Sequence, residues 1–200
     1  LDTVLKPLWD AYAVLKRGRD GRQPLELDLP ERKILLKADG TVDRVVVPER
    51  LDAHKLIEEF MIQANVAAAE TLEAKRQALV YRIHDAPSLA KQESLREFLQ
   101  TLGLSLARGA QMRPNQFNGI LERVRGADNE ALVNEVVLRS QSQAEYSPKN
   151  IGHFGLNLKR YAHFTSPIRR YADLIVHRGL IAALGLGPGG LTQTEADRLE

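Results

Sequence analysis

Two consecutive arginines, Arg169 and Arg170, follow a Ser-Pro pair toward the end of this 200-residue chain. Ser is a favourable N-cap and Pro suits the first helical position, so the pattern predicts a helix from Ser166 to about Leu184, with Gly185 as its stop. The first turn of a helix has backbone N–H groups without partners and the positive end of the helix dipole, and both attract an anion. The sequence therefore predicts an anion site at the start of this helix, where an arginine fork can hold a phosphate through two hydrogen bonds.

Aromatic rings and further cations surround these arginines. The rings are Tyr161, His163, Phe164 and Tyr171. Between Lys159 and Arg178 there are five Lys or Arg and one acid, Asp173, although the whole chain carries a formal charge of only +2. Rings beside cations suit a single-stranded nucleic acid, because bases stack on the rings while the cations neutralise the backbone. In the structural alternative, Arg170 or Arg178 pairs with Asp173 or lies in solvent.

The run His-Phe-Thr-Ser-Pro-Ile-Arg-Arg-Tyr-Ala-Asp-Leu at positions 163–174, with His177-Arg178 after it, resembles the signature of the ribonuclease II and ribonuclease R family of processive 3′ to 5′ exoribonucleases. Two further stretches, 57–65 and 144–157, resemble other blocks of this family, and the forms Tyr-Ala-His-Phe-Thr-Ser and Gly-His-Phe-Gly favour ribonuclease R. The resemblance covers nearly the whole chain. It implies that residues 1–200 are the C-terminal portion of an RNB exoribonuclease catalytic domain, incomplete at both ends.

The resemblance also implies roles for individual residues. Arg169 matches the family's catalytic arginine, which would hold the scissile phosphate and balance the charge that develops on its oxygens. RNA-binding roles are implied for Glu59, Tyr146, His163, Thr165, Ser166, Arg170, Tyr171 and Arg178. Glu59, with Glu58 as the alternative, matches a glutamate that bonds the 3′-terminal nucleotide, and contact with a ribose 2′-OH would distinguish RNA from DNA. Leu27 stands where the family usually has a Phe that clamps a terminal base, and Leu cannot stack on a base as an aromatic ring does.

Hydrolysis by this family is metal-assisted, with carboxylates that hold Mg²⁺. The family's clustered Asp residues lie upstream of the matched region, and this sequence has no such cluster, so the Mg²⁺ ligands are expected outside this chain. The acidic run Glu26, Asp28 and Glu31 makes a poor Mg²⁺ site and is expected to lie on a solvated strand edge. We therefore expect the chain to grip the RNA 3′ end within a nuclease, to need the upstream half of its domain as a partner, and to be inactive alone. The alternative is a catalytically inactive RNA-binding relative of the same fold.

Composition sets further bounds on the protein. Hydrophobic residues make up 44% of the chain, enough for a substantial core, and the absence of Cys excludes disulfides and thiolate metal sites. No stretch is apolar over 18 residues, so we expect no membrane partner and a cytoplasmic location. His84 is expected to be a structural partner and not a metal ligand, because no second ligand lies at metal-binding spacing.

Hydrophobic spacing and turn residues predict the elements that position these side chains. Helices are expected at residues 1–15, 51–75, 88–102, 114–125, 129–139 and 166–184, and another begins at Thr192. A strand is expected at 24–30, another at 79–83, and a β-hairpin joins 33–37 to 42–47 across Asp39-Gly40. The basic run 16–22 is expected to be a solvated loop. The expected fold class is α+β, an RNB-type catalytic domain fragment with helices packed on a mainly antiparallel sheet.

Periodicity also predicts which helix residues face the core. For the helix at 51–75 they are Leu56, Phe60, Met61, Ala64, Ala67, Ala68 and Leu72, and for the helix at 166–184 they are Ile168, Ala172, Ile175, Gly179 and Ala182. Asp128 is the expected cap of the helix at 129–139. In the stretch 144–157, Tyr146, Asn150 and His153 are expected either to contact a ligand or to brace the loop that delivers residues 161–178.

Overall fold

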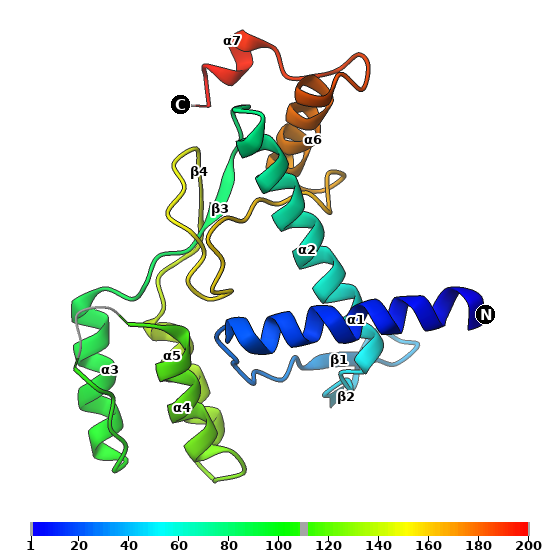
Figure 1. Ribbon diagram of the computed structural model, residues 1–200. Helices are drawn as coiled ribbons and strands as arrows, with labels where there is room; N and C mark the ends of the chain where they lie inside the picture. The colour runs from blue at the N-terminus through cyan, green and yellow to red at the C-terminus, as the bar shows by residue number, and fades with distance from the viewer. Residues whose placement is uncertain (1, 109–111, 200) are drawn as a thin grey trace.

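The computed structural model describes residues 2–108 and 112–199, and in these ranges the chain forms seven helices and four strands (Figure 1). In chain order they are α1 (Asp2–Arg22), β1 (Lys33–Leu36), β2 (Val42–Val46), α2 (Asp52–Ala74), β3 (Tyr81–Ile83), α3 (Leu89–Thr101), α4 (Pro114–Val124), α5 (Glu130–Ser140), β4 (Glu145–Ser147), α6 (Tyr171–Leu184) and α7 (Gln193–Ala196). The predicted α+β class is confirmed. None of the helices in the described ranges is long and apolar enough to cross a bilayer.

The strands form two separate antiparallel pairs. In the β1–β2 hairpin Ile34 lies opposite Val45, and Gly40 in the connecting turn has a φ of +84°, which glycine adopts without strain. The second pair joins β3 to β4, with Arg82 opposite Tyr146. The predicted hairpin and the predicted strand near Leu79 to Ile83 are therefore present, and the antiparallel structure is divided between two small sheets.

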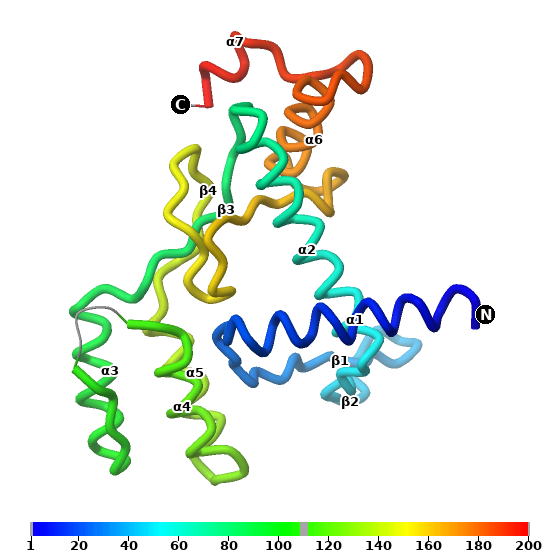
Figure 2. The backbone as a smooth tube through the Cα atoms, in the orientation of Figure 1, coloured from blue at the N-terminus to red at the C-terminus, as the bar shows by residue number. Residues whose placement is uncertain are grey.

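Helices α3, α4 and α5 pack together as a compact unit, which we call the α3–α5 lobe (Figure 2). Its core holds ten buried hydrophobic residues. Three of them, Phe117, Leu99 and Val133, are completely buried. Ser88 caps α3 by accepting a hydrogen bond from Lys91 N, and Gly103 and Gly126 follow α3 and α4 as predicted. The cap of α5 was predicted wrongly, because Asn129 and not Asp128 precedes its first turn.

A second, smaller core lies where α2 crosses α6, beside β3 and β4; we call these elements the α2–α6 region. Its buried residues are Ala68, Ala69, Leu72, Leu79, Tyr81, Ala162 and Val176. Small residues at the crossing let the helices approach closely: a Cβ added at Gly179 of α6 would lie 3.4 Å from a methyl carbon of Leu72. This crossing positions the chain segment that leads into α6.

The predicted core faces of α2 and α6 were partly wrong. On α2, Leu56, Ala68 and Leu72 are buried, but Met61 and Ala67 are exposed. On α6 and its approach, Ile175 and Gly179 are buried, but Ile168 is fully exposed and Ala182 is exposed. Three polar residues of these two helices are buried instead, and they are Glu59, Asn65 and Asp173.

The basic run 16–22 was predicted to be a loop but continues α1 to its end. Lys16 pairs with Asp20 one turn later, with 2.9 Å between Nζ and Oδ2. Arg19 reaches Glu59 of α2, and Arg22 Nε donates to the carbonyl oxygen of Leu156 at 2.8 Å. These contacts extend the helix and connect α1 with α2 and with the loop after β4.

The predicted strand at 24–30 is also absent, because its amides bond to groups that form no ladder. Glu26 N donates to Asn118 Oδ1 at 2.9 Å, and Asp28 N donates to Asn134 Oδ1 at 2.8 Å. The segment is therefore extended and held by side-chain amides of α4 and α5. The carboxylates of Glu26, Asp28 and Glu31 belong to exposed residues.

Candidate functional site

The segment 161–170 runs between α2 and β3 before it enters α6, and its backbone differs from the prediction. Residues 167–169 form a turn, and α6 begins at Tyr171, so the helix does not begin at Ser166. The amides of Arg169 and Arg170 both donate to the carbonyl oxygen of Ser166, at 3.3 and 3.2 Å. This turn places Arg169 before the helix, outside its first turn.

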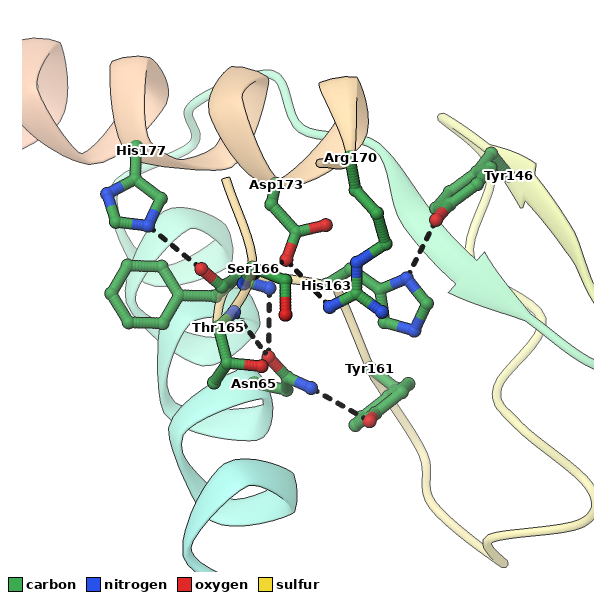
Figure 3. A network of polar contacts seen from close by, with 10 residues as sticks. Asn65, Tyr146, Tyr161, His163, Thr165, Ser166, Arg170, Asp173 and His177 are labelled. Atoms are coloured by element: carbon green, nitrogen blue, oxygen red, sulfur yellow. Dashed lines mark hydrogen bonds and ion pairs between the residues drawn. The ribbon is translucent and has the colours of Figure 1, made fainter. Parts of the chain in front are cut away.

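Asn65 of α2 holds the start of this segment (Figure 3). Its Oδ1 accepts hydrogen bonds from Phe164 N at 2.8 Å and from Thr165 N at 3.3 Å. Its Nδ2 donates to the hydroxyl of Tyr161 at 2.8 Å. One buried carboxamide therefore fixes three residues of the segment.

Asp173 of α6 holds the next part of the segment from the opposite side. It is 0% exposed, and its Oδ1 accepts from Ser166 N and from Arg170 Nη2, each at 2.8 Å. Together with Asn65, this carboxylate occupies the consecutive amides of Phe164, Thr165 and Ser166. The helix predicted to begin at Ser166 begins at Tyr171, so its first-turn amides do not follow Ser166 directly, and the binding of an anion here stays a prediction.

The cations of the segment have different environments. Arg169 is exposed, and its side chain makes no hydrogen bond or ion pair within residues 2–108 and 112–199. Arg170 is bound to Asp173. Arg178 pairs with Glu195 at 2.8 Å and also donates to the carbonyl oxygens of Gly189 and Gly190. Arg169 is thus the cation of this group whose guanidinium is available to a ligand.

The hydroxyls and the ring nearest to Arg169 also differ in access. Thr165 Oγ1 is buried and has no hydrogen-bond partner, whereas Ser166 is only half-buried. The ring of Tyr171, at the first position of α6, is 73% exposed. Tyr171 is therefore open to a ligand beside Arg169, whereas the Thr165 hydroxyl is not.

Tyr146 of β4 and His163 form a polar pair beside the segment. The Tyr146 hydroxyl lies 2.7 Å from His163 Nδ1, and the guanidinium of Arg82 lies over the Tyr146 ring, 4.7 Å from its centroid. Burial, reinforced by the positive charge of Arg170, lowers the pKa of His163 to about 4. His163 is therefore neutral near pH 7 and can accept a hydrogen bond from Tyr146.

Behind this pair, the rings of His163, Tyr161, His153 and His84 stand edge to face. Neighbouring centroids are 5.7, 5.4 and 5.0 Å apart, and Phe154 continues the row to Phe117 of the α3–α5 lobe. Burial lowers the pKa of His153 to about 3 and also lowers that of His84. The sequence showed these rings but not their edge-to-face contacts, because His84 and Phe117 lie far along the chain from residues 153–163.

Hydrogen bonds hold the loop after β4 in place, both within the loop and to His84. Asn150 Nδ2 donates to the carbonyl oxygen of Lys159 at 3.1 Å, and His153 Nδ1 accepts from Leu156 N at 3.1 Å. His84 Nδ1 accepts from Gly155 N at 2.9 Å, and its Nε2 lies 2.9 Å from the carbonyl oxygen of Ser142. A Cβ at residue 155 would lie 3.0 Å from His84 Nδ1, so this close approach requires glycine. The structural role predicted for His84 is confirmed.

The two candidate glutamates of α2 point to different surroundings. Glu59 is 5% exposed and accepts a hydrogen bond from Arg19 at 2.9 Å, whereas Glu58 is exposed and pairs with Arg50. A cavity of about 300 Å³ is lined by both glutamates and by Arg19. A neighbouring cavity of about 540 Å³ is lined by Leu27 and Glu58, among other residues.

Carboxylate and imidazole groups do not converge into a metal site in the described part of the chain. Within residues 2–108 and 112–199, no three His, Asp or Glu side chains lie close enough together to hold an ion. The acids near the segment have protein partners instead: Asp173 binds Arg170, and Glu73 binds Arg160 at 2.9 Å.

Comparison with known proteins gives matches over most of the chain. Ribonuclease R of Vibrio parahaemolyticus is 42% identical over 176 residues, which are 88% of this chain and 21% of that protein. The chain therefore spans about a fifth of the length of this curated relative.

Solved structures show the same architecture. Ribonuclease R of Mycoplasma genitalium, determined in complex with ribose-methylated single-stranded RNA, matches with a TM-score of 0.87 and 29% identity over 98% of this chain and 31% of that chain. The yeast pseudonuclease Ssd1 matches with a TM-score of 0.62 and 25% identity over 76% of this chain and 19% of its own. A family model described as the RNB domain matches residues 2–185. These matches confirm the resemblance found in the sequence, and the chain belongs to the RNB domain family.

Proposed function

We propose that this chain is part of a 3′ to 5′ exoribonuclease that processively hydrolyses single-stranded RNA to 5′-nucleoside monophosphates. Its part is to grip the RNA 3′ end and the scissile phosphate, as the C-terminal portion of an RNB catalytic domain whose upstream half is its partner. The observation that carries this proposal is the state of Arg169: its guanidinium is exposed and unpaired in the described residues, while hydrogen bonds fix the segment on both sides of it.

Arg169 is the proposed catalytic residue. Negative charge builds up on the phosphate oxygens as the phosphodiester is attacked, and a fixed guanidinium stabilises this charge more in the transition state than in the ground state. Ser166 would donate its hydroxyl to the phosphate, and the exposed Tyr171 ring would stack on a base. Thr165 could contribute its hydroxyl only if the segment moves, because that atom is buried.

The remaining candidate residues have supporting roles in this proposal. Tyr146 and His163 would contact RNA as a hydrogen-bonded pair. Arg170 and Arg178 are held by Asp173 and Glu195, so their cations would act on RNA from a distance while they brace the two ends of the site. Glu59 would bond the terminal ribose through the oxygen that Arg19 does not use, approached from the cavity that both residues line.

We propose Mg²⁺ as the cofactor, held by carboxylates outside this chain. The described residues do not fit a Mg²⁺ ion, because their acids are scattered or already paired with arginines. When bound, Mg²⁺ would activate the attacking water and stabilise the leaving oxygen. The residues of this chain would bind and orient the phosphate.

A catalytically inactive RNA-binding relative is the second candidate function. The observation that favours it is the likeness to a yeast pseudonuclease at 25% identity over 76% of this chain. The two candidates share the RNA grip and differ in whether bound RNA is shortened.

The test is degradation of a 5′-labelled single-stranded RNA with a free 3′ end by the full-length protein in Mg²⁺. The wild type is expected to leave only short end products, and Arg169→Ala to act at least about a hundredfold more slowly, since removal of one transition-state donor costs about 3 to 4 kcal/mol. Arg125→Ala, which removes an exposed cation of the α3–α5 lobe, is the matched control and should degrade RNA at the wild-type rate.

RNA binding without shortening would support the inactive relative. Affinity that falls steeply with salt is expected for both candidates, because Lys and Arg displace counterions from phosphates. An affinity that does not respond to salt would contradict both.

A further inference from the structure

Asn65 occupies a special place among the polar residues of the α2–α6 region. It is 3% exposed and lies in the middle of α2, where its side chain faces the segment 161–165 (Figure 3). Its neighbours on the same face are the small core residues Ala68 and Ala69. A polar group at such a position costs free energy unless its hydrogen bonds are satisfied, and those of Asn65 are satisfied by the site segment.

The contacts of Asn65 define the orientation of its carboxamide. Oδ1 receives two consecutive backbone N–H groups, from Phe164 and Thr165, and Nδ2 donates to the Tyr161 hydroxyl. A reversed carboxamide would place its NH₂ group against two backbone donors, so the amides of Phe164 and Thr165 exclude the reversed orientation, whereas the Tyr161 hydroxyl fits either end. The carboxamide therefore fixes both the position and the direction of the segment.

The same segment is fixed again immediately downstream. Asp173 accepts the next amide, from Ser166, and the following turn is closed by the bonds from Arg169 N and Arg170 N to the Ser166 carbonyl oxygen. The backbone that carries the free guanidinium of Arg169 is thus set by Asn65 of α2 and by two residues of α6, Asp173 and His177, whose Nε2 lies 2.8 Å from the Phe164 carbonyl oxygen. Without Asn65, the amides of Phe164 and Thr165 would lose their acceptor, and the segment would be held from α6 and, through the hydrogen bond from Arg82 N to the Tyr161 carbonyl oxygen, from β3.

Asn65 also links the two ends of the proposed site. It follows Glu59 by six residues on α2, which is about 9 Å along a helix axis. Glu59 is the proposed contact to the terminal ribose, and Asn65 determines where the phosphate contact stands. A single rigid helix thereby sets the spacing between the two grips on the RNA.

From these contacts we propose that Asn65 is a positioning residue for RNA hydrolysis: it does not touch the substrate, but it holds the segment 164–169 so that Arg169 meets the phosphate. This inference rests on the proposed nuclease function. Misplacement of a catalytic group by about 1 Å can lower a rate about a hundredfold, so loss of the clamp should affect kcat more than KM.

The test uses the full-length protein and two readouts. The first is the kcat and KM for single-stranded RNA, and the second is amide hydrogen exchange at residues 164–166. Asn65→Ala is expected to lower kcat about 10- to 100-fold with KM within about threefold, and to speed exchange at Phe164 and Thr165 at least about tenfold. Exchange at Ser166 should change less, because Asp173 still accepts its N–H.

Two variants give matched comparisons. Asn65→Asp keeps an oxygen acceptor for both amides, so it should retain slow exchange and a kcat within about fivefold of the wild type. Gln92→Ala removes another buried carboxamide, which donates to the Pro87 carbonyl oxygen beside α3, and should lower stability without a change in kcat. If Asn65→Ala does not fold, Tyr161→Phe frees only the Nδ2 end and should lower kcat about threefold.

A kcat for Asn65→Ala equal to that of Gln92→Ala would overturn the proposal, and so would a lower kcat without faster exchange at Phe164 and Thr165. The exchange readout also separates this proposal from the proposed function. If the wild-type protein does not shorten RNA, the nuclease function fails, whereas faster exchange in Asn65→Ala would still establish the clamp.

Discussion

The α3–α5 lobe and the α2–α6 region bury different kinds of side chains. The lobe is built around ten buried hydrophobic residues, with Phe117 completely enclosed. The α2–α6 region has fewer and smaller buried hydrophobic residues, and its fully enclosed side chains include the carboxylate of Asp173. The comparison indicates that the lobe contributes mainly stability, whereas the α2–α6 region uses interior positions to fix the segment that carries Arg169.

The largest effect is expected from Phe117→Ala in the lobe. Removal of a fully buried aromatic side chain costs about 3 to 5 kcal/mol of unfolding free energy through lost burial and a residual cavity. Urea denaturation of the full-length protein measures this loss. RNA hydrolysis per folded molecule should stay unchanged, and a large decrease would show that the lobe also shapes the site.

Asp173→Ala should have a somewhat smaller effect on stability and a much larger one on activity. It leaves Ser166 N and the half-buried Arg170 without an acceptor, which we expect to cost about 2 to 3 kcal/mol, less than for a fully buried pair. RNA hydrolysis per folded molecule should fall at least about tenfold as the segment loses its hold. The distinction between the two regions fails if Asp173→Ala and Phe117→Ala lose activity only in proportion to their unfolded fractions.

The buried histidines predict how stability depends on pH. Burial lowers the folded-state pKa of His163 to about 4 and of His153 to about 3, both below the ordinary value of 6.5. Between these values and pH 6.5 the unfolded chain binds more protons than the folded protein. The two histidines therefore contribute fully to the free energy of unfolding above pH 6.5, and this contribution is lost as the pH falls. The slope is at most about 1.4 kcal/mol per pH unit for each histidine.

Denaturation at pH 5 and pH 7 checks this prediction. His153→Gln should reduce the difference in stability between the two pH values, and the same change at the exposed His54 should not. Equal pH dependence in His153→Gln and the wild type would contradict the buried, neutral state of the ring row.

The smallest effect is expected from Tyr146→Phe. This change removes one hydrogen bond to His163 at a partly exposed position, for an expected loss of about 0.5 to 1 kcal/mol. Thermal denaturation measures it. If Tyr146→Phe lost more unfolding free energy than Asp173→Ala, the edge-to-face rings of residues 84, 153, 161 and 163 would be the main support of the site, and not the contacts of Asn65 and Asp173.

The sequence predicted the lobe well, because its interior follows hydrophobic periodicity. The helices at 88–102, 114–125 and 129–139 lie within one or two residues of α3, α4 and α5. Their apolar residues recur at helical spacing, and Pro114, Gly103 and Gly126 mark helix boundaries by local backbone chemistry. Local signals suffice where burial is hydrophobic.

The α2–α6 region was predicted less well, because its decisive contacts are polar and join distant positions. Ser-Pro at 166–167 is a strong local signal for a helix start, yet residues 167–169 form only a turn and Arg170 is extended, with φ −129° and ψ 118°, so the helix begins at Tyr171. The sequence did not mark Asn65 as a residue of the site, since its partners lie about a hundred residues away in the chain. The three family blocks located the site region, and their three-dimensional contacts required the structure.

Guanidinium rescue of Arg169→Ala in the full-length protein tests whether the Arg169 side chain acts on the phosphate. The single-turnover rate of RNA shortening is expected to fall at least about a hundredfold and to recover partly as guanidinium is added, because the free cation can occupy the place of the missing side chain beside the phosphate. Urea, a neutral molecule of similar shape, should not restore the rate, and Arg125→Ala should respond to neither. Shortening of RNA by Arg169→Ala at the wild-type rate would show that Arg169 is not a catalytic residue.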